Sequence, residues 1–138
     1  MRRAAAVLSA ILLALPACGA AWLSLTTGFP ILPAGAVGFA VSILGCRFLF
    51  DRINGLIWVS FGAAAAFSWI GLLLGYASLI LRENAAYGCT LAEALSILPQ
   101  VLTSPVNRAD VLADHLQIGL GLLVMLGMTL LFLARQRR

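Results

Sequence analysis

Four long apolar runs divide this chain and restrict what it can fold into. An α-helix needs about 20 residues to cross the hydrocarbon core of a bilayer, and each run is close to that length. The runs cover residues 4–27, 31–50, 55–81 and 116–134. The segment between the last two, residues 82–115, is too short to bury a core of its own. The sequence therefore predicts an all-α, polytopic membrane protein in which four transmembrane helices form a single membrane domain over residues 1–138.

The composition agrees with a membrane environment. Hydrophobic residues make up 62% of the chain and charged residues 10%, whereas about a quarter of the residues of soluble domains are charged. The mean hydropathy is +1.04. We therefore expect the lipid bilayer to surround the protein. Arg without Lys, together with abundant Ala, Gly and Leu, is typical of GC-rich bacterial genomes and indicates a bacterial inner membrane.

The arginines predict the orientation of the bundle. Most of them lie at one set of helix ends: Arg2, Arg3, Arg47, Arg52, Arg135, Arg137 and Arg138. Only Arg82 and Arg108 lie at the other set. By the positive-inside rule both termini are cytoplasmic and residues 82–115 lie outside. The pI near 9.6 reflects this topology and indicates no nucleic-acid partner, because the arginines form no continuous basic patch.

The stretch LLALPACGAAW, residues 12–22, allows two interpretations. A small residue before Cys18 resembles a lipoprotein signal that is cleaved and lipidated at the cysteine. However, Pro16 is unusual in such a signal, and the chain stays apolar beyond Cys18 to Trp22 and Leu25. We therefore expect an unprocessed first transmembrane helix with a kink at Pro16, which is tolerated inside a helix bundle.

Small residues recur at every fourth position of the first two runs. They are Ala6, Ala10, Ala14 and Cys18 in the first run, and Ala34, Gly38, Ser42 and Cys46 in the second. Such stripes let helix backbones approach closely in lipid. The connection TGFPILP is short, so these helices should form an antiparallel hairpin. Gly71 and Gly75 form a GxxxG pair in the third run, which packs either within the chain or in a homodimer.

The segment between the third and fourth runs carries helix signals. Thr90 and Glu93 have the spacing of a capping box. Leucines then repeat at helical intervals, at Leu91, Leu95, Leu98 and Leu102. This pattern predicts a short amphipathic helix on the outer membrane interface, with Pro99 ending or kinking it. Either Ser104 before Pro105, or Asn107 three residues before Asp110, can start a further helix that continues into the fourth crossing.

A family resemblance rests on the second half of the chain. A membrane helix that ends in small residues is followed by TLAEALSILPQVLTS and then by a second helix that ends in LFLARQRR. This arrangement resembles the repeating unit of the copper-resistance D family of bacterial inner-membrane proteins, over about residues 55–138. Thr103 is the position that matches a family residue. The resemblance implies copper handling or transport at the inner membrane.

The residues themselves permit a copper hypothesis, because Cu(I) prefers thiolate and thioether ligands with some imidazole. Candidate ligands are Cys18, Cys46, Met125 and Met128 within the bilayer and His115 outside it. At about 1.5 Å per helical residue, Cys18 lies at a depth of about 21 Å and Cys46 at about 6 Å from the cytoplasmic ends, which excludes a disulfide between them. Met125 lies at about 14 Å and Met128 at about 8 to 9 Å. A shared copper ion requires Cys18 to face both methionines. Alternatively, these residues fill the core.

Two charged groups have functional and structural interpretations. Asp110, Asp114 and His115 are either a metal or proton entry point at the outer mouth, or a solvated helix start with acids near its positive dipole end. Arg47 and Asp51 have the spacing of an i,i+4 ion pair.

Catalysis is not expected. The chain has no CxxC motif and no set of a nucleophile and a base, and no acidic residue lies deep in a predicted crossing. Two functions remain open. The first is a small inner-membrane protein that handles or transports copper, with copper as its only candidate cofactor. The second is a non-catalytic accessory or assembly subunit, bound to a larger membrane complex or to copies of itself.

Overall fold

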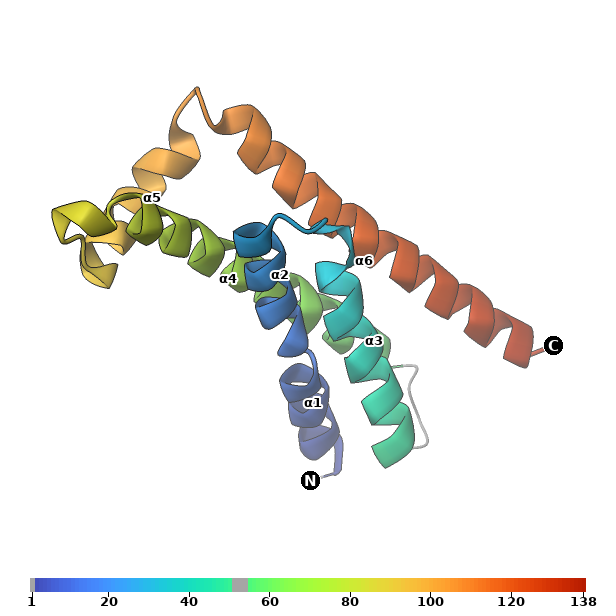
Figure 1. Cartoon of the computed structure of the whole chain (residues 1–138). Coiled ribbons are helices and arrows are strands. Elements are labelled where there is room, and N and C mark those ends of the chain that lie inside the picture. The colour runs from blue at the N-terminus through green and yellow to red at the C-terminus, as the bar shows by residue number, and fades with distance from the viewer. Residues whose placement is uncertain (1, 51–54) are drawn as a thin grey trace.

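The computed structural model describes residues 2–50 and 55–138, so Asp51 and Arg52, with the predicted Arg47 to Asp51 pair, lie outside the described residues. All regular secondary structure in these two ranges is helical (Figure 1), which confirms the all-α prediction. The elements in chain order are α1 Arg2–Leu13, α2 Pro16–Thr27, α3 Leu32–Leu49, α4 Leu56–Glu83, the 3-10 helix η1 Ala85–Tyr87, α5 Leu91–Thr103 and α6 Arg108–Gln136.

Three helical stretches are long and apolar enough to cross a membrane. They are Arg2–Thr27, which comprises α1 and α2, and the two long helices Leu56–Glu83 and Arg108–Gln136. Helix α3 is also apolar but shorter, with an apolar part over Pro33–Leu49. The chain therefore has the helices of a multi-pass membrane protein, with three candidate spans and one shorter apolar helix beside them.

The predicted kink at Pro16 is present as a break between two helices. Helix α1 ends at Leu13 and α2 begins at Pro16. Proline has no amide hydrogen to continue the helical ladder, and the amide of Ala17 bonds the carbonyl of Ala14, three residues back, at 3.0 Å. The first apolar run thus consists of two helices joined by one tight turn.

Helices α2 and α3 form a closely packed hairpin. Helix α2 ends at Gly28, which adopts the left-handed conformation of a helix C-cap, with φ +79°. Helix α3 then returns along α1 and α2. A Cβ atom at Gly38 would overlap the Cβ of Ala17 and lie 2.8 Å from the carbonyl oxygen of Ala14. This contact between backbones is possible only because residue 38 has no side chain.

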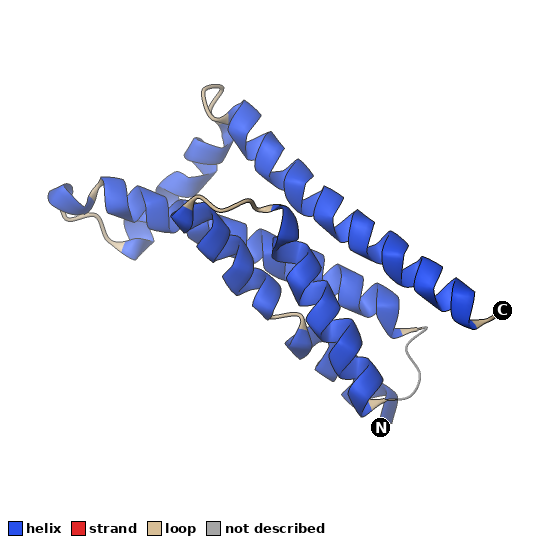
Figure 2. Cartoon of the chain, turned by 45° about the vertical axis from the view of Figure 1, so that its right-hand side comes forward, coloured by secondary structure: helices blue, strands red, loops and turns tan. Residues whose placement is uncertain are grey.

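Helices α3 and α4 are central in the bundle, and α2 and α6 both pack against them. Phe39 of α3 and Leu72 of α4 are fully buried at this centre. Figure 2 shows both termini toward one end of the bundle, while α5 and the connection from α2 to α3 lie toward the other. The four apolar stretches, namely α1 with α2, then α3, α4 and α6, therefore alternate in direction along the chain.

Helix α5 begins as predicted but continues further. The Thr90 hydroxyl accepts a hydrogen bond from the Glu93 amide at 3.3 Å, which confirms the N-cap. Of the two alternatives predicted at Pro99, an end and a kink, the end is absent, because α5 runs to Thr103. Its proline removes one backbone bond, while Ala94 and Leu98 stay buried against Ile80 of α4 and hold the helix in place.

The apolar side of α5 is divided between two environments. Leu98 is buried and Leu102 packs against the same cluster as Ile80. Leu95 and Leu91, one and two turns before Leu98, are exposed. The amphipathic helix therefore docks on α4 through Ala94 and Leu98 and presents Leu91 and Leu95 to its surroundings.

Helix α6 begins at Arg108, after Asn107. Of the two expected helix starts, the structure has the one at Asn107 and not the one at Ser104. The side-chain amide nitrogen of Asn107 donates to the carbonyl of Val101 at 3.2 Å and does not cap α6. Asp110, Asp114 and His115 consequently lie on the first two turns of a continuous helix that reaches Gln136.

Candidate polar site between α4 and α6

Two hydrogen-bonded pairs connect α4 with the first part of α6. The Tyr76 hydroxyl donates a short hydrogen bond to the Asp114 carboxylate. A carboxylate acceptor makes this bond stronger than one between two neutral groups. Both side chains are only partly exposed, so the bond is shielded from full solvation.

The second pair fixes the histidine. The indole nitrogen of Trp69 donates to Nε2 of His115 at 3.2 Å, and Nδ1 of His115 lies 2.7 Å from the carbonyl oxygen of Val111. An indole nitrogen only donates and a carbonyl only accepts, so Nε2 is the acceptor and the hydrogen is on Nδ1. His115 is therefore assigned as a neutral imidazole with both nitrogens in use.

Both pairs lie along the length of α4 and not at its end. At 1.5 Å per residue, Tyr76 is about 10 Å and Trp69 about 21 Å from the α4 end at Glu83. Both belong to the candidate span Leu56–Glu83. Asp114 and His115 thus contact a candidate membrane span, whereas the sequence placed them in the outer segment. Ionisable residues at such positions are usually paired, as they are here.

Asp114 also lines an open pocket of about 450 Å³. Asp114 and Gln117 line it on α6, opposite Ser24 and the residues that connect α2 to α3. Asp110 is exposed on the first turn of α6 and takes no part in either pair. The predicted outer cluster is therefore divided: Asp114 and His115 contact α4, while Asp110 does not.

A serine bridge connects three helices at the other end of the bundle. Ser42 Oγ lies 2.7 Å from the carbonyl oxygen of Ala10 and 2.7 Å from Ser60 Oγ, and all three residues are buried. Since a hydroxyl has one hydrogen and a carbonyl oxygen only accepts, Ser42 donates to Ala10 and accepts from the Ser60 hydroxyl. Ala34 and Gly38 lie buried on the same helix, so this stripe of α3 packs inside the bundle.

The GxxxG pair of α4 faces α2 within the chain. A Cβ at Gly71 would overlap the carbonyl oxygen of Cys18, and one at Gly75 would lie 2.6 Å from the side chain of Leu25. The sequence allowed this glycine pair to pack either within the chain or in a homodimer, and the structure shows the contact within the chain.

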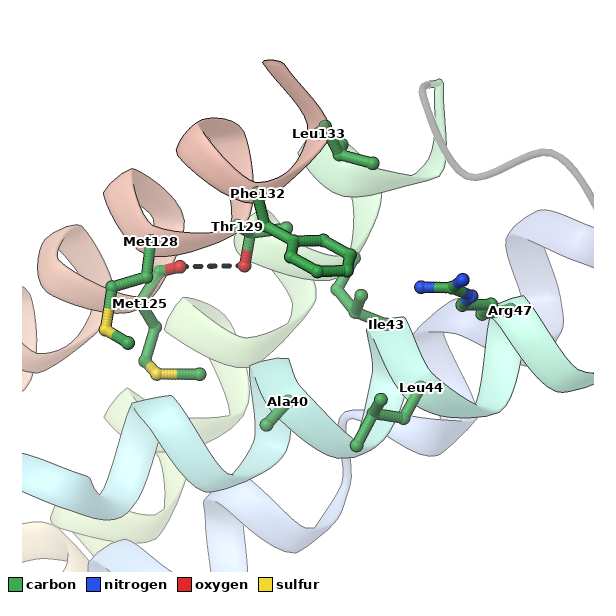
Figure 3. Close-up of a pocket in the computed structure, with 9 residues that line it drawn as sticks. All are labelled: Ala40, Ile43, Leu44, Arg47, Met125, Met128, Thr129, Phe132 and Leu133. Atoms are coloured by element: carbon green, nitrogen blue, oxygen red, sulfur yellow. Dashed lines mark hydrogen bonds between the residues drawn. The ribbon is translucent and has the colours of Figure 1, made fainter. Parts of the chain in front are cut away.

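The candidate soft metal ligands lie in separate places. Cys46 is buried against Ala10 and Leu56. Cys18 is on α2, where its backbone abuts α4. Met125 and Met128 are on α6 and line a groove with α3 (Figure 3). Helices α2 and α6 both pack on α3 and α4 but hardly on each other, so α3 and α4 lie between Cys18 and the two methionines.

Only the two methionines are therefore brought together. His115 is engaged by Trp69, and the three cysteines are free thiols, as expected for Cys18 and Cys46. Across residues 2–50 and 55–138, no group of three or more His, Cys, Asp or Glu side chains could hold a metal ion. The donor set proposed from the sequence does not fit one copper ion in this arrangement.

The sequence did not identify three hydrogen-bonding partners: Trp69 and Tyr76 in the site between α4 and α6, and Ser60 in the serine bridge. A signal was available for Trp69, because a tryptophan in the middle of an apolar run needs an acceptor for its indole N–H. The partners of Tyr76 and Ser60 depend on how the helices cross, which residue spacing does not give.

No protein-family model, no curated protein and no solved structure matches this chain. The resemblance to the copper-resistance D family rests on the loop sequence and the two flanking helices alone.

Proposed function

We propose that this chain is a bacterial inner-membrane protein that crosses the bilayer four times, with both termini in the cytoplasm. The apolar part of α3, Pro33–Leu49, spans about 25 Å at 1.5 Å per residue, and helices of about 17 residues are at the short end of those that cross. Helix α3 returns antiparallel to α2, and the arginines concentrate at the end that holds the termini. Both features support four crossings with that end inside.

We further propose a non-catalytic function, as an accessory or assembly subunit of a larger membrane complex. One observation carries this proposal: within the described ranges, every buried side-chain nitrogen or oxygen has a hydrogen-bond partner. A site that binds or transports a solute keeps polar groups turned toward that solute. Here Tyr76 and Asp114 hold α6 on α4, and Ser42 holds α3 on its neighbours. Such an interior suits a stable helical scaffold.

Copper handling is the second candidate, because Met125 and Met128 line the same groove and thioethers are Cu(I) ligands. It requires at least one further soft ligand to reach this groove. Cys18 is separated from it by α3 and α4, and Cys46 is buried against Ala10 and Leu56. The arrangement of the helices therefore favours the accessory function.

Two measurements on the protein purified from its own membranes test this choice. For an accessory subunit, we expect a complex of fixed stoichiometry with a second membrane protein, and little copper. The double variant Met125→Leu, Met128→Leu keeps volume and hydrophobicity, so it should leave both the complex and the copper content unchanged. One copper per chain that is lost in the double variant would establish copper handling instead. Cross-linking in intact cells that finds only the monomer would also contradict the accessory function.

A further inference from the structure

An apolar groove of about 320 Å³ runs between α3 and α6 (Figure 3). Two helical stripes line it: Ala40, Ile43, Leu44 and Arg47 from α3, and Met125, Met128, Thr129, Phe132 and Leu133 from α6. The one hydroxyl among them, on Thr129, donates to the carbonyl of Met125 at 2.8 Å. The walls of the groove therefore offer dispersion contacts and no unsatisfied polar group to an occupant.

One end of the groove is cationic. The Arg47 guanidinium carbon lies 5.8 Å from the centroid of the Phe132 ring. The guanidinium carries five N–H donors in a planar fork, which suits an anion with two acceptor oxygens such as a phosphate. Because Arg47 lines the groove, these donors can reach an anion bound at this end of it.

Further arginines lie at the same end of α6. Arg135 is in its last turn, and Arg137 and Arg138 follow it in the sequence. The groove thus leads from apolar walls in the middle of the bundle to a concentration of positive charge at the end that holds both termini.

We propose that this groove binds an anionic diacyl phospholipid, with one acyl chain along the α3 and α6 stripes and its phosphate at Arg47. An acyl chain matches the uninterrupted apolar lining, and the phosphate matches the in-plane N–H donors of the guanidinium. Basic pockets between membrane helices at the cytoplasmic side commonly hold anionic lipid headgroups. The inference rests on the proposed crossing of the bilayer by α3, and it does not depend on the accessory function or on any protein partner.

Native mass spectrometry of the detergent-purified chain tests the site with three ligands. Phosphatidylglycerol is the anionic lipid, and phosphatidylcholine with the same acyl chains is the zwitterionic lipid. Inorganic phosphate represents the headgroup alone. We expect one saturable phosphatidylglycerol molecule per chain, weaker binding of phosphatidylcholine and no retained phosphate. Arg47→Gln should weaken phosphatidylglycerol binding about tenfold or more, since a hydrogen bond to a charged group contributes about 1.5–3 kcal/mol.

Two further variants separate charge from shape. Arg82→Gln removes a charge at the opposite end of the bundle and should leave binding unchanged. Ala40→Phe narrows the groove and should weaken both phospholipids. If Ala40→Phe perturbs the fold, as judged by its thermal unfolding, Leu44→Phe on the exposed side of the same stripe replaces it. Equal losses in Arg47→Gln and Arg82→Gln, or undiminished binding with the groove narrowed, would overturn the proposal.

Discussion

The contact of Gly71 with the backbone of Cys18 places a strict limit on side-chain size at one point of the bundle. An added Cβ would overlap the carbonyl oxygen of Cys18 and lie 2.8 Å from its carbonyl carbon. A backbone carbonyl in a helix cannot rotate away, so α2 and α4 must move apart. We expect Gly71→Ala to lower the free energy of unfolding by about 1–3 kcal/mol, despite the better helix propensity of Ala.

Gly62→Ala is the matched control on the same helix, because a Cβ at Gly62 meets nothing within 4 Å. It should be neutral or stabilise the protein by up to about 1 kcal/mol through helix propensity. Thermal or SDS-induced unfolding in detergent measures both variants. Equal stability of the two would mean that α2 and α4 do not touch at Gly71.

The bond between Tyr76 and Asp114 is expected to stabilise the attachment of α6. Tyr76→Phe removes the donor and Asp114→Leu removes the acceptor with little change in size, so the pair forms a double-mutant cycle. Hydrogen bonds between membrane helices contribute about 0.6 kcal/mol on average and up to about 1.7. We expect a coupling energy near the upper end of this range, because a carboxylate acceptor makes the hydrogen bond stronger. Tyr87→Phe serves as the control, because Tyr87 is exposed. If the cycle gives no measurable coupling energy between Tyr76 and Asp114, the hydrogen bond does not form.

At the scale of a single element, α5 depends on its first residue for a defined start. The Thr90 hydroxyl satisfies the Glu93 amide, and loss of such a cap costs about 1 kcal/mol. Thr90→Ala should therefore speed hydrogen exchange of the α5 amides by about fivefold. Ser96→Ala removes a hydroxyl that bonds the Glu93 carbonyl within the same helix and should change exchange little. Unaltered exchange in Thr90→Ala would contradict the capping role.

Most elements could be predicted from the sequence because their signals are local. Pro16 breaks the first apolar run, Thr90 caps α5, and the fourth long helix begins after Asn107. Pro99 did not end α5, whose Ala94 and Leu98 pack against Ile80 of α4. The polar site was not predictable, since Tyr76 and Asp114 are 38 residues apart and meet only through the crossing of α4 and α6.

At the scale of the whole molecule, the number and direction of the crossings determine where each end of the chain lies. Four crossings with the arginine-rich end inside place Cys89 outside and Gln136 in the cytoplasm. A chain with only the three longest apolar stretches across the bilayer, and the same N-terminal side, would reverse both positions. Cysteine accessibility therefore distinguishes the two arrangements.

Three single-cysteine variants test this topology with a membrane-impermeant thiol reagent in intact, reduced spheroplasts. The first keeps Cys89 and replaces Cys18 and Cys46 with Ala; the other two also carry Cys89→Ser and introduce Gln136→Cys or Ala4→Cys. We expect Cys89 to react in intact spheroplasts, and the introduced cysteines to react only after lysis, because the seven arginines at their end resist translocation. Labelling of Gln136→Cys from outside, with Cys89 protected, would exclude the proposed topology. The Ala4→Cys variant then identifies the cause: it stays protected if α3 does not cross, and it reacts if the whole bundle is inverted.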